Sequence, residues 1–545
     1  MCGEKYLTRV LLMKMMKMNN KFYSGMLVFF GIIILVVFYF FQKNNTANIQ
    51  RENEDKFKDI AVNIDLEALK FKPLSFPDRE CNILNYGAEE SGKKLATEAI
   101  RQAIDDCAKQ GGGKVVIPTG KWKTGAIHLK SNINLYLEDN SQLIFSSNPQ
   151  NYLPVVFSRF EGMELYNYSP FIYAKDCENV ALGGKGEIIG QGEKWNDWND
   201  KQKSAVNELY DMADKDVPVE KRIFGTEKAA LRPNFIEFVG CRNVEISGLT
   251  IIDGPMWTLH PLYSENVYIH DLNIKTKSHN TDGVVIDSSK NVLVENCKFE
   301  TGDDAVSIKS GLDNDGWRVG RSSENIVIRK ISTKRGHGSV NIGSEMSGGV
   351  KNVLVYDCDF FNTQSGVRIK TLRGRGGFVE NATFYDIRML DVNDPIIMDL
   401  RYPAYTVTPK TKAMPNIKNI LFSDINSIAS RNAIFIRGFS EKDNLSEISF
   451  KNISMKALNG VLIDGAENLK FENIDIDIEV KKDKSLVSVS ESFNLIFKKI
   501  KCNDNIEICF RILGEELGGI DLKESGISNI NERMQFTQDE KFFEN

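Results

Sequence analysis

The stretch Lys290-Asn291-Val292-Leu293-Val294 decides the fold, because versions of it return along much of the chain. Each version has an Asn followed by a short run with apolar residues at alternate positions. Other full copies are Arg242-Asn243-Val244-Glu245-Ile246, Glu265-Asn266-Val267-Tyr268-Ile269, Glu324-Asn325-Ile326-Val327-Ile328 and Lys351-Asn352-Val353-Leu354-Val355. Shorter matches follow at Glu380-Asn381, Lys418-Asn419, Glu467-Asn468 and Phe493-Asn494.

The spacing of these Asn residues predicts a solenoid of strands. Successive copies are 23 to 38 residues apart, and one step of 49 residues spans two repeats, with Glu447 where Asn would fall. A repeat near 25 residues with alternating apolar positions and Gly or Asn turns is typical of stacked coils of about three short strands each. We therefore expect an all-β fold, a parallel β-helix whose inward side chains form the core.

The regions flanking the repeats predict the domain limits. Ala96, Ile100, Ala103, Ile104, Cys107 and Ala108 follow the helical period, and three Gly end the helix at 111–113. This amphipathic helix is expected to cover the open end of the solenoid, whose first coil starts at Lys114. We place the β-helix domain at residues 76–535, with a polar, partly helical insert at 201–222 and a polar tail at 536–545.

An apolar run from Tyr23 to Phe41 predicts export. As a helix, its 19 residues would span roughly 28 Å, close to the thickness of a bilayer core. Lys14, Lys17 and Lys21 precede it, so residues 1–41 have the form of a basic region followed by a signal or anchor helix. The absence of small residues at its exit favours an uncleaved anchor over a cleaved signal. Residues 42–75 are expected to be a linker, and the rest of the chain to be exported, as a periplasmic, membrane-anchored or secreted domain.

Composition excludes some classes of function. The net charge of -5 gives no basic excess for nucleic acid, so no nucleic-acid partner is expected, and membrane contact is expected only through the N-terminal segment. None of the nine Cys forms a CxxC pair, which argues against a metal site. Cys297 and Cys358 occur in matching contexts and are expected in the core, whereas Cys502 and Cys509 either pair in an oxidising compartment or stay reduced.

Four short motifs carry the chemistry. They are Asn280-Thr281-Asp282, Gly302-Asp303-Asp304, Gly336-His337-Gly338 and Arg368-Ile369-Lys370. Asp282 precedes the Asp pair by about one coil, and stacked coils lie about 4.8 Å apart, so the motifs should follow one another along one wall of the solenoid. Each motif alone is an ordinary turn or exposed strand, and their joint order and spacing indicate an active site.

These residue types suit hydrolysis of an anionic polysaccharide. Glycoside hydrolysis needs one protonated carboxyl for the leaving oxygen and one carboxylate that activates water or attacks carbon. Three crowded carboxylates repel one another, so at least one should retain a proton near neutral pH. Arg368 and Lys370 alternate with Ile369 on a strand and therefore point the same way, which suits a substrate carboxylate.

In this order, the four motifs resemble those of the polygalacturonases of glycoside hydrolase family 28. The resemblance covers residues 80–440, with further matches at 81–88, 111–118, 231–235, 255–261 and 342–349 that are similar to the bacterial, exo-acting branch. It implies a right-handed parallel β-helix and metal-independent hydrolysis of α-1,4-galacturonosyl bonds in polygalacturonate or pectin, with inversion and no cofactor. Ala305 and Ser339 depart from residues common in the family, without removing a group that the mechanism needs.

The resemblance also implies roles for individual residues. Asp303 would be the general acid, Asp282 and Asp304 would activate water, and His337 would relay or tune the proton of the acid. Asn280 would orient this group, Arg368 and Lys370 would hold the galacturonate carboxylate, and Tyr402 would line a subsite. His260 either reaches substrate or packs beside Pro261, and His279 is expected in a loop; neither is included in the catalytic set.

Three alternatives to a polygalacturonase stay open at this point. A related pectin, rhamnogalacturonan or xylogalacturonan, could be the substrate, although the complete Gly-His-Gly and Arg-Ile-Lys motifs favour galacturonate. A polyuronate lyase of the same fold would be expected to use Ca²⁺ or an Arg base. A binding solenoid without catalysis would not need the Asp trio. Exo-action is favoured by the inserts at 201–222 and 313–321 and by the loop after Tyr402, which could close one end of a groove.

Overall fold

The computed structural model describes residues 71–90, 92–403, 408–439, 444–479, 484–504, 506–514 and 519–538. By contact density the chain divides at residue 62, and all described residues belong to the second unit, 63–545. The apolar run expected at 23–41 lies outside them. Within the described part, none of the helices combines the length and apolarity needed to cross a membrane.

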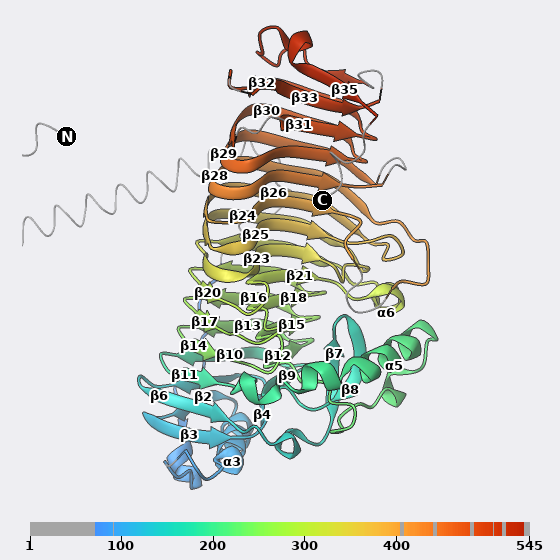
Figure 1. The fold of residues 1–545 in the computed structure, drawn as a ribbon. Helices are drawn as coiled ribbons and strands as arrows, with labels where there is room; N and C mark the ends of the chain where they lie inside the picture. Colours follow the sequence, from blue (N-terminus) through green and yellow to red (C-terminus); the bar gives the residue numbers. More distant parts are fainter. Residues whose placement is uncertain are drawn as a thin grey trace, which may run out of the picture. The chain divides into compact units, whose positions relative to one another are not determined.

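The second unit is a stack of coils joined by parallel pairing (Figure 1). In the first coils each turn has three strands, one on each face. The first face comprises β1 (Glu80–Asn82), β2 (Gly113–Ile117), β5 (Ile133–Leu137), β10 (Glu178–Gly184), β13 (Arg242–Ser247), β16 (Glu265–His270), β19 (Lys290–Glu295) and β22 (Ser323–Arg329). The second comprises β3 (Gly120–Thr124), β6 (Ser141–Phe145), β11 (Glu187–Ile189), β14 (Thr250–Ile252), β17 (Asn273–Lys275) and β20 (Lys298–Glu300). The third comprises β4 (Ile127–His128), β9 (Ile172–Lys175), β12 (Ile236–Val239), β15 (Leu259–Leu262), β18 (Val284–Asp287) and β21 (Val306–Lys309).

Later strands are longer because several continue through a corner from one face to the next. β23 (Ser332–Gly343) pairs with β20 near its start and with β21 near its end. The remaining strands are β24 (Val350–Phe361), β25 (Thr363–Lys370), β26 (Phe378–Leu390), β27 (Asp394–Asp399), β28 (Asn416–Arg437), β29 (Leu445–Asp464), β30 (Glu467–Ile478), β31 (Ser485–Ser490), β32 (Phe493–Lys501), β33 (Ile508–Leu513), β34 (Ile520–Asp521) and β35 (Met534–Thr537). The predicted parallel β-helix is thus confirmed.

The repeated Asn residues explain how the coils align. Asn243, Asn266 and Asn291 have positive φ angles of 55–57°, a left-handed conformation that Asn tolerates better than most residues. The side-chain amide of each donates a hydrogen bond to the Asn of the preceding coil, at 2.9–3.1 Å. Glu447, the predicted substitute, has a φ of 55°. The Asn ladder therefore makes the turn and also joins neighbouring coils.

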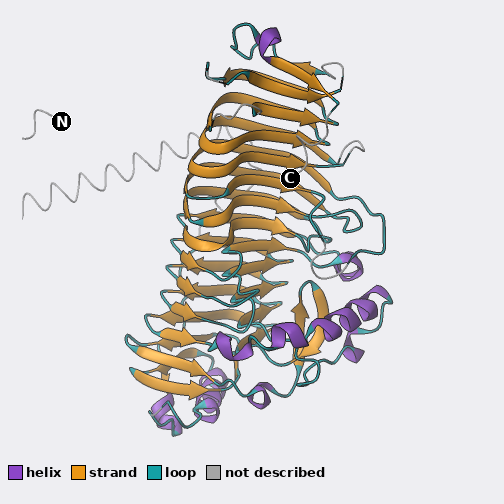
Figure 2. Cartoon of the chain, in the orientation of Figure 1, coloured by secondary structure: helices purple, strands orange, loops and turns teal. Residues whose placement is uncertain are grey.

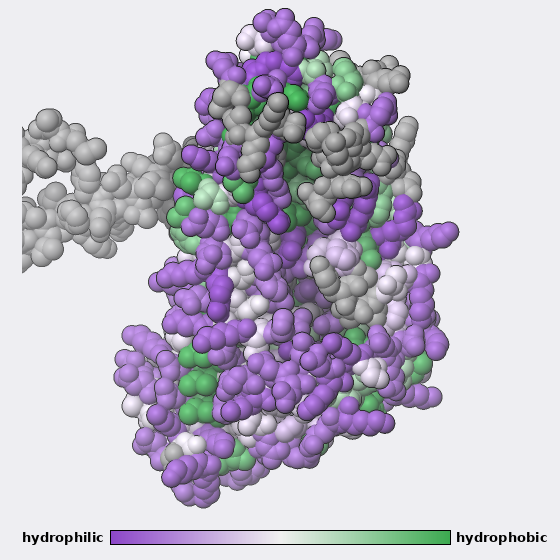
Figure 3. Space-filling view, viewed as in Figure 1, coloured by the Kyte–Doolittle hydropathy of each residue, from purple (hydrophilic) through white to green (hydrophobic). Residues whose placement is uncertain are grey.

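The core consists of stacked identical or similar side chains. Val244, Val267 and Val292 occupy one inward ladder and are at most 1% exposed. Farther along, the rings of Phe384, Phe422, Phe450, Phe471 and Phe497 stack with centroid separations of 4.6–5.1 Å, close to the spacing of the coils. Cys297 and Cys358 are buried as predicted. The face seen in Figure 3 is mainly hydrophilic, as expected when apolar residues point inward.

Helices and a hairpin lie outside the coils, mostly toward the N-terminal end of the stack (Figure 2). The predicted helix is α3 (Thr97–Lys109), which packs on β1 and β2. The others are α4 (Trp198–Lys201), α5 (Lys203–Asp214), α6 (Asp313–Val319) and the 3-10 turns η1 (Ile83–Tyr86), η2 (Pro149–Tyr152), η3 (Gly192–Trp195), η4 (Val219–Lys221) and η5 (Ile530–Arg533). The hairpin is β7 (Val156–Phe160) with β8 (Met163–Asn167). Cys502 and Cys509 form a disulfide.

Residues 313–316 correct one expectation. They belong to the insert at 313–321, whose sequence indicates a loop, but they begin α6. The N–H of Asp313 donates to the hydroxyl of Ser347 at 2.8 Å, and Asn314 donates to the Asp214 carbonyl of α5 at 2.9 Å. Partners distant in the sequence therefore stabilise a short helix that local propensity did not predict.

Candidate active site

Two of the predicted carboxylates occupy equivalent positions on neighbouring coils. Val284 of β18 pairs with Val306 of β21, and the N–H of Gly283 donates to the carbonyl of Asp304 at 2.9 Å. Asp282 and Asp304 therefore lie one above the other, each just before its strand. The hydroxyl of Ser307 lies between them, 2.7 Å from Asp282 Oδ2 and 3.3 Å from Asp304 Oδ2.

The two cations reach Asp304 from a coil farther along the solenoid. Arg368 pairs in register with Asn341, and Lys370 with Gly343, so the two cations are on the strand rather than in the turn that carries Asp304. Their side chains extend back to it: Arg368 Nη2 lies 3.2 Å from Asp304 Oδ1, and Lys370 Nζ lies 3.0 Å from Oδ2. Side-chain length thus brings together motifs that the coil register alone keeps apart.

The two glycines of Gly336-His337-Gly338 are explained by close approach. A Cβ on Gly336, whose φ is 155°, would lie 2.7 Å from the carbonyl oxygen of Asp303. A Cβ on Gly338 would lie 2.2 Å from the side-chain nitrogen of Asn341, whose amide oxygen accepts a bond from Arg368 at 3.1 Å. The glycines let His337 sit beside Asp303, with Nδ1 3.1 Å from Oδ1.

The environments of the acidic groups differ strongly. Burial raises the pKa of Asp282 well above its ordinary value, and the neighbouring charges of Asp303 and Asp304 raise it further. Burial also acts upward on Asp304, but Lys370, Arg368 and Lys309 outweigh it and lower its pKa to about 2. A carboxyl whose pKa is raised thus lies beside one whose pKa is lowered.

His337 is the third titratable group whose environment shifts its proton affinity. The hydrogen bond to Asp303 raises the pKa of His337, although burial acts in the opposite direction. Its side chain is 41% exposed, compared with 19% for Asp303. The pair is therefore the accessible part of the cluster, while Asp282 and Asp304 form its floor.

All eight predicted site residues line one pocket of about 510 Å³. They are Asn280, Asp282, Asp303, Asp304, His337, Arg368, Lys370 and Tyr402. Lys370 Nζ lies 5.4 Å from the centroid of the Tyr402 ring, and the Arg368 guanidinium 5.9 Å, so this ring flanks both cations. No cluster of three or more His, Cys, Asp or Glu side chains within the described ranges is arranged to hold a metal ion.

The sequence did not reveal the role of a second ion pair in the pocket. Lys309 Nζ lies 2.7 Å from Glu345 Oε2, and the side chains are only 6% and 12% exposed. The ammonium also lies 5.1 Å from the centroid of the Trp257 ring. Lys309 ends β21, the strand that follows Asp304, and contributes to lowering the pKa of Asp304. Its burial has no local sequence signal, because its partner is 36 residues away.

Other pocket residues come from segments without a motif. Glu161 is at the tip of the β7–β8 hairpin, and His279, in a loop as expected, also lines the pocket. Arg232 Nη2 donates to the side-chain oxygen of Asn280 at 2.7 Å, which orients this residue. A Gly turn between two alternating segments, Glu161-Gly162, was the signal that could have predicted the hairpin.

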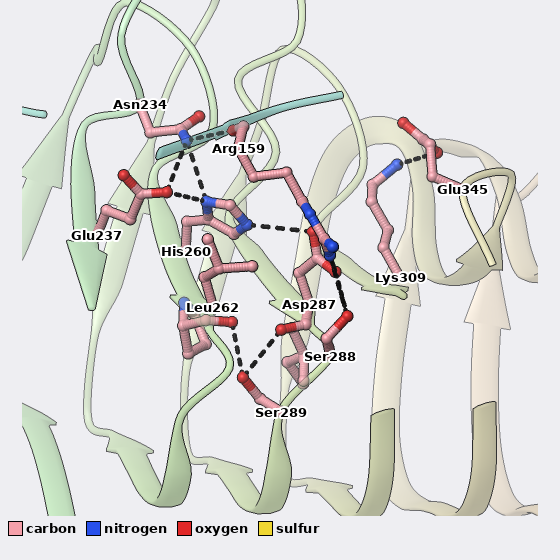
Figure 4. Close-up of polar contacts among 12 residues, drawn as sticks. Arg159, Asn234, Glu237, His260, Leu262, Asp287, Ser288, Ser289, Lys309 and Glu345 are labelled. Atoms are coloured by element: carbon pink, nitrogen blue, oxygen red, sulfur yellow. Dashed lines mark hydrogen bonds and ion pairs between the residues drawn. The ribbon is translucent and has the colours of Figure 1, made fainter. Parts of the chain in front are cut away.

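His260 is a packed histidine and not a pocket residue, which decides between the two alternatives. It is fully buried, with Nδ1 2.9 Å from Glu237 and Nε2 3.5 Å from Asp287. Burial lowers its pKa, but the two carboxylates outweigh this and raise it. Arg159 of β7 lies 2.7 Å from Asp287, so the cluster in Figure 4 joins the hairpin to the coils.

Comparison with known proteins agrees with this site. The model of "Glycosyl hydrolases family 28" matches residues 107–460. A probable polygalacturonase of Vitis vinifera is 30% identical over 373 residues, 66% of this chain and 71% of the relative. The exo-poly-alpha-D-galacturonosidase of Dickeya chrysanthemi is 27% identical over 72% of this chain and 70% of its own length.

A solved structure shows the same architecture. The hyperthermoactive exopolygalacturonase of Thermotoga maritima is 38% identical, with a TM-score of 0.72 over 75% of this chain and 95% of that one. The resemblance to bacterial exo-polygalacturonases indicated by the motifs is confirmed. By the match of its sequence and the likeness of its fold, the chain belongs to glycosyl hydrolases family 28, as a glycoside hydrolase of the polygalacturonase type.

Proposed function

We propose that the protein hydrolyses α-1,4-galacturonosyl bonds of polygalacturonate or pectin by an inverting mechanism that needs no metal, and that it acts from chain ends. The observation that carries the proposal is the convergence of an Asp trio and an Arg–Lys pair in one pocket. Three carboxyl groups can supply the acid and the base, and the two cations suit a uronate carboxylate.

Asp303 and His337 are assigned to the leaving-group side of the reaction. The raised pKa of His337 lets the imidazole hold a proton 3.1 Å from Asp303. Asp303 passes its proton to the glycosidic oxygen as the bond to the anomeric carbon breaks, and His337 restores that proton. This pair is the more exposed part of the cluster, which suits contact with the bond being cleaved.

Asp304 and Asp282 are assigned to the attacking water. The low pKa of Asp304 makes it the ionised member, so it accepts the proton that water loses on attacking the anomeric carbon. Asp282, whose pKa is raised by burial, and the Ser307 hydroxyl orient that water and carboxylate. Arg368 and Lys370, flanked by Tyr402, hold the carboxylate of the sugar, and Asn280 is held in place by Arg232.

Three inserts that contact one another support exo-action. The hydroxyl of Tyr210 of α5 lies 3.1 Å from the carboxylate of Asp313 of α6 and 3.4 Å from the Thr408 carbonyl oxygen, and can donate to either. Lys410 lies 2.9 Å from Asp211 and from Asp214. The α6 segment reaches the pocket through Leu312 and through Asp313, whose carboxylate lies 3.4 Å from the pocket residue Arg375. Such a wall beside the pocket suits the end of a chain better than its middle.

The test is product analysis on polygalacturonate in the presence of EDTA. Hydrolysis should raise reducing ends without the absorbance of a 4,5-double bond, and a Ca²⁺-dependent rise in that absorbance would indicate a lyase instead. Exo-action should release monomer or dimer from the start while viscosity falls slowly. Early mixed oligomers with rapid loss of viscosity would contradict exo-action.

A pair of variants connects the inserts to the cleavage pattern. Tyr210→Ala removes the contacts from α5 to α6 and to residue 408, so it should increase the share of mid-length products. Glu208→Ala, on the exposed face of the same helix, is the control and should leave the pattern of the parent. Equal patterns for all three proteins would remove the inserts from end selection.

Export is part of the proposal. It is supported by the apolar run Tyr23–Phe41 after Lys14, Lys17 and Lys21, and by the Cys502–Cys509 disulfide, which is usual in oxidising compartments. Fractionation of expressing cells should place activity in the envelope or medium, and activity confined to the cytoplasm would contradict it. Membrane retention after a salt wash would distinguish an anchor from a cleaved signal.

A further inference from the structure

A second pocket lies next to the catalytic one, on the following coils. Its volume is about 380 Å³, and it shares Arg368 and Tyr402 with the catalytic pocket. Arg368 pairs in register with Ile397, which pairs with Phe435, so the new pocket covers two further coil steps. At about 4.8 Å per coil this is roughly 10 Å, enough room for additional sugar units of a bound chain.

Apart from the shared Arg368, the cations of this second pocket are matched one to one by carboxylates. Arg437 makes a bidentate pair with Asp399, with Nε 3.0 Å from Oδ1 and Nη2 2.8 Å from Oδ2. Arg431 pairs with Asp394 through Nε and Nη2. In the catalytic pocket, by contrast, Arg368 and Lys370 share the single carboxylate of Asp304. A uronate would gain little from guanidinium groups that already have fork-to-fork partners.

The remaining lining of this pocket is apolar or carries amides. Phe435 and Ile397 are partly exposed outward side chains on neighbouring coils. The Arg437 guanidinium lies 5.3 Å from the centroid of the Phe435 ring, so it helps to hold that ring. Asn432 donates to Asp394 at 2.7 Å and accepts from Asn459 at 2.8 Å, and the remaining N–H and C=O groups of the two amides can bond to hydroxyls. An aromatic and aliphatic floor with a few polar groups is typical of a site for an uncharged ligand.

We propose that the second pocket is a subsite for an uncharged pyranose unit of the substrate chain, with methyl-esterified galacturonate as its main occupant. The inference rests on the proposed function, since it assigns the part of the same chain that extends past Arg368. The enzyme would therefore require a free carboxylate at Arg368 and Lys370 and favour an ester farther along. Partly esterified pectin meets both requirements in one molecule.

The test uses tetragalacturonates that carry one methyl ester at a defined residue, together with the free acid. At least one regioisomer should be hydrolysed with kcat/KM roughly fivefold above that of the free acid, which corresponds to about 1 kcal/mol. A tetrasaccharide with rhamnose at the same position tests whether the methyl ester itself is recognised. If it is hydrolysed as fast as the favoured ester, the pocket accepts any uncharged sugar, and methyl-esterified galacturonate is not its main occupant. If every ester isomer is slower than the free acid, the inference is overturned.

Two variants make the test specific to this pocket. Asp399→Asn leaves Arg437 without its carboxylate, while the amide oxygen can still accept the N–H of Arg401. Asp399→Asn should therefore hydrolyse the free acid with a higher kcat/KM than the favoured ester. An unchanged preference for the ester would count against the inference. Phe435→Ala should lower kcat/KM for the favoured ester more than for the free acid, and equal losses would contradict an apolar floor.

A control variant and a comparison of substrates separate failure of this inference from failure of the proposed function. Ile428→Ala, at an exposed apolar position of the same β28 strand, should keep the ester preference of the parent. Failure to hydrolyse any galacturonate substrate would overturn the proposed function itself. Hydrolysis of the free acid without preference for any ester would overturn only the assignment of the second pocket.

Discussion

Replacing Lys370 by Met should move the acid limb of the pH–activity profile to higher pH. Among the cations that lower the pKa of Asp304, Lys370 has the largest effect, and its ammonium lies 3.0 Å from the carboxylate. With all cations present, Asp304 changes from its ordinary pKa of 3.8 to about 2, so it is ionised throughout the range in which enzymes are normally assayed.

The magnitude follows from the opposing influences on Asp304. A shift of that size corresponds to about 2 kcal/mol in favour of the carboxylate form, at about 1.4 kcal/mol per pKa unit. It is achieved against burial, the largest single influence, since only 1% of the side chain is exposed. With Lys370 neutral, burial is opposed by fewer charges, and the pKa should rise by about one to two units.

The direction of the effect can be stated in terms of activity. A base with a depressed pKa is active above that pKa and loses activity as pH falls through it. In Lys370→Met the pKa rises, so kcat/KM should begin to fall at a pH about one to two units higher than in the parent. Lys370→Arg keeps the positive charge, so the acid limb of its pH–activity profile should lie at the same pH as in the parent, even if KM increases.

The assay is kcat/KM on a soluble oligogalacturonate between pH 3 and 7. Lys298→Met, which removes an exposed Lys from β20, is the control and should not move the limb. If Lys370→Met is slower at every pH but its kcat/KM falls at the same acidic pH as in the parent, Lys370 serves substrate binding only and does not control the ionisation of Asp304. Such a result would refute the electrostatic reasoning.

Three further outcomes are expected. Asp303→Asn should lower kcat by about 10²–10⁴-fold while circular dichroism remains unchanged, and a kcat within about tenfold of the parent would remove it from general acid catalysis. Arg159→Met leaves Asp287 buried without its main cation and should cost about 3–5 kcal/mol in denaturant unfolding, partly restored by also replacing Asp287 with Asn; an unchanged midpoint would show that the buried pair is not needed. Replacing Cys502 and Cys509 together by Ser should destabilise the C-terminal coils by about 2–3 kcal/mol with activity retained, and loss of activity without loss of stability would contradict this.

The repeat could be predicted from the sequence because the same residue type, Asn, both forms the turn of its own coil and bonds to the neighbouring coil. Asn291 makes its own left-handed turn and also bonds to Asn266 on the neighbouring coil, so the constraint recurs at every coil and is visible as a period. Seven of the eight predicted residues that line the pocket belong to the four motifs, which lie in consecutive coils, and Tyr402 was predicted from the resemblance to the family. That Arg368 and Lys370 reach back to Asp304 was not predicted, because it depends on side-chain length.

The buried ion pairs could not be predicted from the sequence, because their two partners lie far apart along the chain. Lys309 reads as an ordinary strand residue, and only the folded chain places Glu345 beside it. Arg159 likewise reads as a surface residue in an insert, although it is fully buried against Asp287. Such charges have no local pattern, since their burial is tolerated only when a distant partner arrives.

The reaction stereochemistry tests the central claim most directly. Proton NMR of polygalacturonate during the first minutes, with EDTA present, should show new reducing ends that appear as the β-anomer and then equilibrate, with no unsaturated product. The same experiment on Asp303→Asn should show almost no reducing ends. Initial release of the α-anomer would indicate retention, and signals of a 4,5-unsaturated residue would indicate elimination; either result would contradict hydrolysis by the Asp trio as described.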